Sequence, residues 1–367
     1  MSINQNILIP DGDSTWALSV IQCLSQVEGY NLFVLSSTKR TATKFSNCTF
    51  YYKFYEKTND IDWIDIINSE IEKHAIAVVL PIAEREILFF IKNKEQISSL
   101  ALISPLPNLK DFETAVDKRR LSDFAKIHNI PHPNSFYFTS EIDTQGVWSQ
   151  IKFPILIKPL HLKGGDGIQK INSRDTFQKY LEKANNTLFI QEYIEGYDID
   201  CSVLCLNGKI LCHTIQKGSL KGDNNFAPQL AFDFFQNEEV LEVAKLTMSK
   251  LNWSGIAHLD MRYDTRANNF KLIEINARFW GSIEGSMFAG INFADHVIRL
   301  ALNQDVSYKD AEVIHYMRLK GVVKSIKNNP LFILKRQYLL NNTQTKTFLK
   351  DPLPTLYKFR EWLGRRF

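Results

Sequence analysis

Residues 272–282 read Leu-Ile-Glu-Ile-Asn-Ala-Arg-Phe-Trp-Gly-Ser, and this stretch decides the fold prediction. Its first residues alternate as a β-strand does, so Glu274 and Asn276 face the same side about 6.6 Å apart. Asp260 ends an earlier strand-like segment that can pair beside this one. Two carboxylates and an amide carbonyl are hard oxygen ligands suited to Mg²⁺. Arg278 follows and stays charged, so it can bind the oxygens of an acyl phosphate or a tetrahedral intermediate.

These assignments have ordinary alternatives. A strand with a polar solvent face would carry the same residues, and Arg278 would then pair with an acid such as Glu284. The paired strand-like segment of Asp260 favours the metal site.

An upstream segment has the features of a phosphate site. Residues 155–159 place Lys158 at the end of a buried strand, where a lysine is costly to desolvate unless an anion meets it. Glycines 164, 165 and 167 follow, and glycines let backbone N–H groups approach phosphate oxygens. The spacing is not that of a Walker A loop. The alternative is a solvated lysine before an ordinary turn.

A third segment, residues 189–198, runs from an apolar strand into alternating acids. Its backbone offers hydrogen-bonding groups to a flat purine edge, and Asp198, two residues past Gly196, can accept hydrogen bonds from two ribose hydroxyls. A solvated loop between strands is the alternative.

The first hundred residues alternate between strand-like and helical patterns, which predicts a parallel sheet with crossover helices. Asp13 or Ser14 is expected to cap a helix over about residues 15–27. Residues 10–15 carry one glycine where a dinucleotide fingerprint needs three, so no nicotinamide cofactor is expected. One continuous helix is predicted over about residues 112–128.

In this order, the segments resemble the ATP-grasp superfamily of ligases, with a match from about Thr114 to Ala301. The resemblance implies an α/β fold, α+β in its C-terminal part, in which a Rossmann-like N-terminal domain precedes a two-lobed ATP-grasp domain. The implied division of the chain is a Rossmann-like domain over 1–110, a small lobe with the phosphate-covering loop over 111–190, a large lobe with the metal site over 191–305, and a basic helical tail over 306–367.

The resemblance also assigns site residues, with ATP and Mg²⁺ or Mn²⁺ as cofactors. It gives nucleotide binding to Lys118, Lys158, Gly164, Gly165, Gly167, Gln191, Glu192, Ile194 and Asp198. It gives the metal to Asp260, Glu274 and Asn276. Because His258 stands where D-alanine ligases carry an arginine, the catalytic oxyanion role passes to Arg278. Lys217 and Lys221 both lie where a third phosphate lysine is expected; we take Lys217 as the candidate, although the spacing does not choose between them.

The implied activity is that of an ADP-forming carboxylate–amine ligase. ATP would activate a carboxylate as an acylphosphate, an amine would attack it, and an amino acid is expected as one of these small-molecule substrates. The alternative is a non-catalytic nucleotide-binding regulatory or scaffold protein, which the retention of all three metal-binding side chains disfavours. The sequence leaves open the carboxylate, the nucleophile and the oligomeric state.

The amino-acid composition is used to predict the cellular compartment of the protein. The chain has 367 residues, 44% of them hydrophobic and 23% charged, as in ordinary globular proteins. It has no apolar run of 18 residues and no secretion signal, so we expect it in the cytoplasm. Cys201, Cys205 and Cys212 are interpreted as buried thiols, because the first two would be about 13 Å apart on a strand.

The C-terminal segment 311–367 carries 12 Lys and Arg against 3 Asp and Glu. Leu356, Phe359, Leu363 and Phe367 recur on one helical face. The favoured interpretation is that this stripe packs onto the protein itself. The other is contact with an anionic membrane or a polyanion, with a lipid-linked or glycan acceptor at the inner membrane surface. No nucleic-acid partner is expected, because no array of stacking aromatics accompanies the charge.

Overall fold

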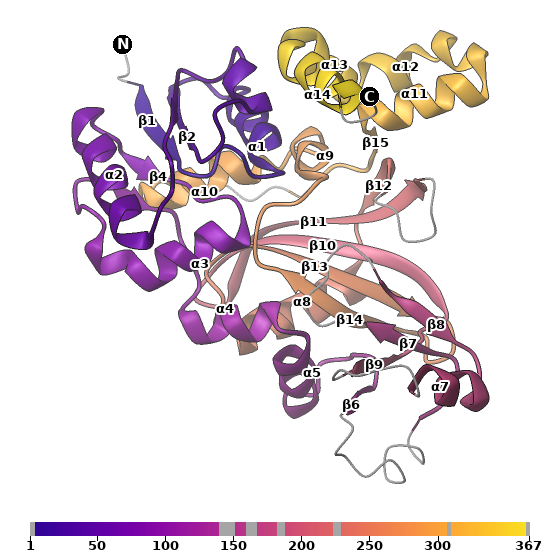
Figure 1. Cartoon of the computed structure of the whole chain (residues 1–367). Coiled ribbons are helices and arrows are strands. Elements are labelled where there is room, and N and C mark those ends of the chain that lie inside the picture. Colours follow the sequence, from indigo (N-terminus) through magenta and orange to yellow (C-terminus); the bar gives the residue numbers. More distant parts are fainter. Residues whose placement is uncertain are drawn as a thin grey trace.

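The computed structural model describes residues 4–138, 151–158, 167–181, 188–222, 229–306 and 310–364. It confirms the predicted mixture of a parallel N-terminal sheet and antiparallel sheets further along the chain (Figure 1). The four-part division of the chain is kept as a proposal.

The N-terminal sheet has five parallel strands in the order β3-β2-β1-β4-β5. They are β1 (Gln5–Ile9), β2 (Tyr30–Ser36), β3 (Tyr51–Phe54), β4 (Val78–Val79) and β5 (Leu102–Ile103). The connecting helices are α1 (Ala17–Leu24), η1 (Ala42–Phe45), α2 (Asp60–Lys73), α3 (Glu84–Asn93) and η2 (Lys94–Gln96). Strand β3 was not predicted; it is a four-residue edge strand whose side chains are half-buried or exposed.

Two predictions about helix boundaries are wrong. Neither Asp13 nor Ser14 caps α1, which begins after Trp16 without a side-chain cap; Asp13 instead accepts a hydrogen bond from Ser37 Oγ at 2.6 Å. The expected helix over 112–128 is divided into α4 (Leu109–Val116) and α5 (Lys118–Ile127). Asp117 takes an extended conformation between them and accepts hydrogen bonds from the first backbone N–H groups of α5, as a helix N-cap does.

A second sheet of four antiparallel strands has the order β6-β9-β7-β8. Its strands are β6 (Ser135–Phe138), β7 (Ile155–Lys158), β8 (Gln169–Ile171) and β9 (Leu188–Glu192), and α7 (Arg174–Leu181) packs beside it. This sheet presents the end of β7, with Lys158, and the end of β9 toward the third sheet (Figure 1).

The third sheet has six antiparallel strands in the order β14-β13-β10-β11-β12-β15. They are β10 (Gly196–Leu206), β11 (Lys209–Leu220), β12 (Ala231–Phe235), β13 (Gly255–Asp264), β14 (Asn269–Asn276) and β15 (Ile314–Met317), with α8 (Glu238–Lys250) on one face. Asn207 and Gly208 turn between β10 and β11 with φ of 49° and 78°, backbone angles that asparagine and glycine tolerate in tight hairpins. Cys201, Cys205 and Cys212 are buried free thiols, which confirms their interpretation.

The remaining helices are α9 (Ile283–Phe288), α10 (Phe293–Ala301), α11 (Leu319–Asn328), η3 (Pro330–Leu334), α12 (Arg336–Leu340), α13 (Gln344–Lys350) and α14 (Leu353–Gly364). Helices α9 and α10 pack against α1 and share its core. The segment 306–367 is not helical throughout, because β15 pairs with β12 at the edge of the third sheet. This pairing brings Arg318, at the start of α11, next to Gly281.

Candidate active site

Three neighbouring strands at the β14 edge of the third sheet bring carboxylates together. Asp200 on β10 lies opposite Asp260 on β13, and Asp260 lies opposite Glu274 on β14. Asn276 donates a hydrogen bond from Nδ2 to Asp260 Oδ2 at 3.2 Å. The structure therefore brings the three predicted metal ligands together and adds Asp200, which the sequence analysis missed.

His258 completes this cluster. Its Nε2 lies 3.3 Å from Asp260 Oδ1 and 3.9 Å from Asp200 Oδ2, while Nδ1 is 2.8 Å from Ser202 Oγ. Burial, together with the smaller effect of the charge of Arg278, lowers the pKa of His258 to about 3. The imidazole is therefore neutral at physiological pH and does not balance the carboxylates.

The carboxylates are poorly compensated in the described structure. Burial raises the pKa of Asp200 and of Asp260, and the negative charge of Glu274 raises that of Asp260 further. Gln216 donates to Asp200 at 3.1 Å, but its own Oε1 is buried without a hydrogen-bond partner among the described residues. Such a set of oxygen atoms fits a divalent cation, which would favour the ionised carboxylates.

A cavity of about 310 Å³ opens onto these residues. Five predicted site residues line it: Lys118, Asp260, Glu274, Asn276 and Arg278. Its wall also contains residues that the sequence did not reveal, including Trp16, Glu84, Asp200, Gln216, Gln229, Phe232, Trp280, Gly281 and Arg318. The wall thus combines the N-terminal unit, the third sheet and the segment after β15.

Arg278 is held in place within this wall. Its Nη2 donates to Asn276 Oδ1 at 2.6 Å, its Nε lies 3.6 Å from Glu84 Oε1, and its guanidinium carbon is 5.1 Å from the centre of the Trp16 ring. The alternative pairing of Arg278 with Glu284 is wrong. Glu284 is buried elsewhere and accepts hydrogen bonds from Ser19, Gln344 and Thr347.

Arg318 is a second guanidinium on the cavity wall, and it meets Trp16 at Gly281. A Cβ atom at Gly281 would lie 3.2 Å from Trp16 and 3.5 Å from Arg318 Nη1, so the glycine leaves room for both side chains. No side-chain hydrogen bond or ion pair of Arg318 is present among the described residues, although Glu284 lies near enough to interact with its charge. The arginine is therefore available to an anion in the cavity.

The predicted phosphate residues lie beside the carboxylates. Lys158 is buried at the end of β7, and burial lowers the pKa of its ammonium group, whereas the charge of Glu274 opposes that shift. Lys118 is the first residue of α5 and lines the cavity. Gly164 and Gly165 lie outside the described residues, and Gly167 has a φ of 72°.

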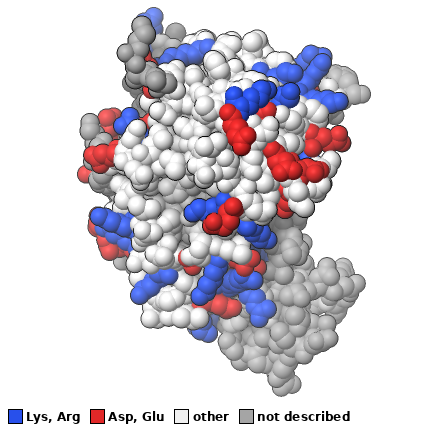
Figure 2. Space-filling view, turned by 90° about the vertical axis from the view of Figure 1, so that its left-hand side faces the viewer, with Lys and Arg blue, Asp and Glu red and all other residues white. Residues whose placement is uncertain are grey.

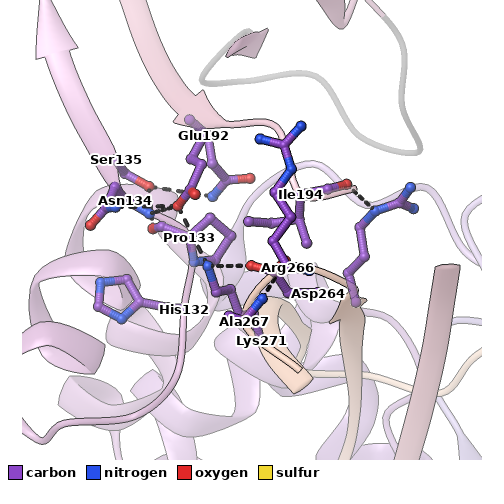
Figure 3. A network of polar contacts seen from close by, with 12 residues as sticks. His132, Pro133, Asn134, Ser135, Glu192, Ile194, Asp264, Arg266, Ala267 and Lys271 are labelled. Atoms are coloured by element: carbon purple, nitrogen blue, oxygen red, sulfur yellow. Dashed lines mark hydrogen bonds and ion pairs between the residues drawn. The ribbon is translucent and has the colours of Figure 1, made fainter. Parts of the chain in front are cut away.

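The predicted adenine segment is fixed by a polar network between the second and third sheets (Figure 3). Gln191 is buried, with Nε2 3.4 Å from Ser135 Oγ. The carboxylate of Glu192 accepts hydrogen bonds from the backbone and side chain of Asn134 and lies 3.6 Å from Lys271 Nζ, which is 2.8 Å from Asp264. The backbone N–H of Glu192 also donates to the carbonyl of Asn134 at 2.8 Å, so both its carboxylate and its N–H are occupied by protein contacts.

Arg262 binds the part of this segment that follows Glu192. The sequence did not predict this role. Its guanidinium donates to the carbonyls of Ile194 and Gly196 at 2.7 and 2.8 Å and pairs with Asp198, the predicted ribose ligand. An arginine in the middle of β13 gives no sequence signal for this role. Lys217 Nζ lies 3.6 Å from the centre of the Tyr197 ring, outside the wall of the 310 Å³ cavity.

Comparison with known proteins places this geometry in context. Residues 184–324 match a family model described as ATP-grasp in the biosynthetic pathway with Ter operon. The chain is 22% identical to D-aspartate ligase from Enterococcus faecium (strain Aus0004) over 230 residues, which cover 56% of this chain and 54% of that protein. It is 25% identical to D-alanine–D-alanine ligase from Carboxydothermus hydrogenoformans over 216 residues, 51% of this chain and 68% of that protein. The match therefore spans about half the length of D-aspartate ligase.

Solved structures share the fold. N5-carboxyaminoimidazole synthetase from Staphylococcus aureus, in complex with ADP, aligns with a TM-score of 0.71 and 13% identity over 92% of this chain and 87% of that chain. L-amino acid ligase from Bacillus licheniformis aligns with a TM-score of 0.57 and 14% identity over 82% and 74% of the two chains.

Proposed function

We propose that the chain, which belongs to the ATP-grasp superfamily, is an ADP-forming ligase that joins a carboxylate to an amine with ATP and Mg²⁺ or Mn²⁺. One observation carries this proposal: three carboxylates, Asn276, Lys118 and Arg278 all line a single cavity. A non-catalytic nucleotide-binding scaffold would have no need of a poorly compensated carboxylate cluster next to an arginine.

The role proposed for each site residue follows from its charge. A Mg²⁺ ion held at the carboxylates would supply Lewis-acid stabilisation of the negative charge on the transferred phosphoryl group. Asp260 and Glu274 would hold that ion through their carboxylate oxygens, with Asp200 opposite Asp260 on the neighbouring strand. Asn276 would join them by turning its amide, because its Nδ2 now donates to Asp260 and its Oδ1 accepts from Arg278. Lys118 and Lys158 would neutralise phosphate charge. The lowered pKa of Lys158 reflects burial, which an anion at its ammonium group would compensate.

Arg278 would bind the oxygens of the acylphosphate and of the tetrahedral intermediate formed by amine attack. Its contacts with Asn276 and Glu84 fix the guanidinium before substrate arrives, so little reorganisation is needed. His258 stays neutral and orients the carboxylates. Lys217 or Lys221 remains the candidate for a third phosphate contact.

We further propose that one substrate is an amino acid whose own carboxylate binds Arg318. The arginine lies on the same cavity wall as Arg278 but beyond Gly281, so a second anionic group would reach it while the reacting group stays beside Arg278. Planar guanidinium groups bind carboxylates through two parallel hydrogen bonds.

We also propose that the protein acts in the cytoplasm, against the inner membrane surface, on a lipid-linked or glycan acceptor. The basic segment 311–367 supports this placement. Among the residues that the structure describes, none of the helices has the length and hydropathy to cross a bilayer.

The test is a substrate screen. The purified protein is incubated with ATP, Mg²⁺ and pools of amino acids and other carboxylates, ADP release is measured, and mass spectrometry identifies the product. Substrate-dependent ADP release with a condensed product supports the ligase. Tight binding of Mg²⁺·ATP with no ADP release from any pool would favour the scaffold instead.

A further inference from the structure

We propose that one face of α14 docks the protein onto an anionic lipid bilayer through exposed apolar side chains surrounded by basic ones. This inference gives the proposed membrane contact a defined surface and rests on that contact, but it does not depend on the ligase chemistry.

Helix α14 is fixed to the body of the protein by one side only. Tyr357 stacks on Phe45 with ring centres 4.7 Å apart, and its hydroxyl donates to the carbonyl of Arg40 at 3.0 Å. Just before the helix, Asp351 is buried and accepts hydrogen bonds from Ser46 Oγ at 2.5 Å and from the backbone N–H of Asn47 at 2.9 Å. These contacts hold the helix in one orientation, with its other side facing away from η1.

The apolar stripe lies on that other side. Five large apolar side chains of α14 remain between 38% and 56% exposed: Leu353, Leu356, Phe359, Trp362 and Leu363. Leu356, Phe359 and Leu363 are spaced by three and four residues, so they share one helical face. The favoured sequence interpretation, that this stripe packs onto the protein itself, is therefore wrong for these described positions. Scattered exposed apolar residues are ordinary, but a cluster of them on one helix marks an interaction surface.

The charge of the surrounding segment indicates which kind of partner this face of α14 binds. Lys358 and Arg360 are exposed on α14 together with one acid, Glu361, and the segment 311–367 as a whole has twelve basic and three acidic residues. One of those acids, Asp351, is already occupied by Ser46 and Asn47. By contrast, acidic and basic side chains intermingle on the face of the molecule seen in Figure 2.

An anionic bilayer satisfies both parts of this surface. Leucine and aromatic side chains enter the boundary between headgroups and acyl chains, while lysine and arginine remain at the phosphate level. A second copy of the chain would satisfy only the apolar part, because pairing this face with itself would bring two strongly basic segments together. Helices α11–α14 gather at one end of the molecule, so a flat surface can approach them (Figure 1).

Sedimentation with vesicles tests the inference without ATP or substrates, so failure of the ligase proposal would not affect the result. The full chain is mixed with phosphatidylcholine vesicles that contain or lack phosphatidylglycerol, at low and high salt. We expect binding to the anionic vesicles only, weakened by salt. The double variant Phe359→Ser/Leu363→Ser should bind at least about tenfold more weakly, because it removes apolar area from the contact.

A matched control removes exposed apolar residues elsewhere. Ile127 and Leu100 are 74% and 68% exposed, and the double variant Ile127→Ser/Leu100→Ser should bind vesicles as the wild type does. Circular dichroism and thermal melting check that both variants are folded. The inference is overturned if the wild type does not bind anionic vesicles, or if both double variants bind equally well. It is also overturned if sedimentation equilibrium shows a dimer that only Phe359→Ser/Leu363→Ser dissociates, without vesicle binding.

Discussion

Replacing Glu274 with glutamine tests the metal site most directly, because it removes one negative charge and keeps the shape of the side chain. Two unit charges 4 Å apart interact by about 1 kcal/mol in water and by about 4 kcal/mol at an effective dielectric constant of 20. Glu274 is half-buried, which places its interaction between these limits, and the double charge of Mg²⁺ moves it toward the upper one. We therefore expect a loss of about 3 kcal/mol, or roughly a hundredfold weaker Mg²⁺ binding.

The assay is ADP release as a function of Mg²⁺ concentration, with the substrate pair found in the screen. Glu274→Gln should shift the Mg²⁺ dependence to about hundredfold higher concentrations. The control is Glu195→Gln, since Glu195 is exposed and pairs with Arg266 away from the cavity. If Glu274→Gln retains the Mg²⁺ dependence of the wild type, Glu274 does not bind the metal.

The same substitution should leave the metal-free protein at least as stable as the wild type. The raised pKa of Asp260 means that its contribution to stability is present below the ordinary value of 3.8 and is lost as the pH rises toward the raised value. Glu274 is one cause of the raised pKa of Asp260, so Glu274→Gln should reduce the stability that the protein loses as the pH rises. Without Mg²⁺, the melting temperature of the wild type should therefore fall more between pH 4 and pH 8 than that of the variant. A steeper fall in the variant would contradict the electrostatic account of the cluster.

Two further predictions concern other parts of the site, and a third concerns a buried carboxylate outside the cavity. Lys158→Met should weaken ATP binding by at least about tenfold in calorimetric titrations, whereas Lys152→Met, at an exposed position, should not. Equal losses of ATP affinity in the two variants would mean that Lys158 does not belong to the phosphate site. Arg318→Met should raise KM for the amino acid by about tenfold with little change in kcat, and Arg318→Lys should restore part of the loss; an unchanged KM would remove Arg318 from substrate binding. Glu284→Ala should lower the free energy of unfolding by about 3 kcal/mol in denaturant titrations, because three hydrogen-bond donors lose their acceptor, and the exposed Glu239→Ala should change it little.

Local sequence was sufficient for the features that depend on one strand or one turn. The alternation along β14 places Glu274 and Asn276 on one side because side chains in any strand alternate. The hairpin at Asn207 and Gly208 follows from the backbone angles that these residues tolerate. The order of such segments was also enough to predict the mixed fold.

Local signals failed where neighbouring elements compete. The pattern over 112–128 is apolar at helical spacing on both sides of Asp117, so it predicts one helix, yet the cap formed by Asp117 divides it in two. Strand β15 has only four residues, and its sequence does not predict a strand. It forms because β12 supplies its hydrogen bonds. Isolated short strands have no such partner in a local pattern.

Long-range packing alone decided the rest. Asp200 becomes a fourth oxygen-bearing neighbour of the metal site only through the register of β10 against β13. Trp16 and Arg318 are about three hundred positions apart in the sequence, and they meet at Gly281 because α1 and the strand before α11 both pack around α9. The sequence of the apolar stripe on α14 does not reveal whether the stripe is buried or exposed to solvent. The contacts of Tyr357 and Asp351 determine that it is exposed. A sequence specifies which side chains are present and how they alternate, whereas the partner of each face is set by the free energy of packing the whole chain.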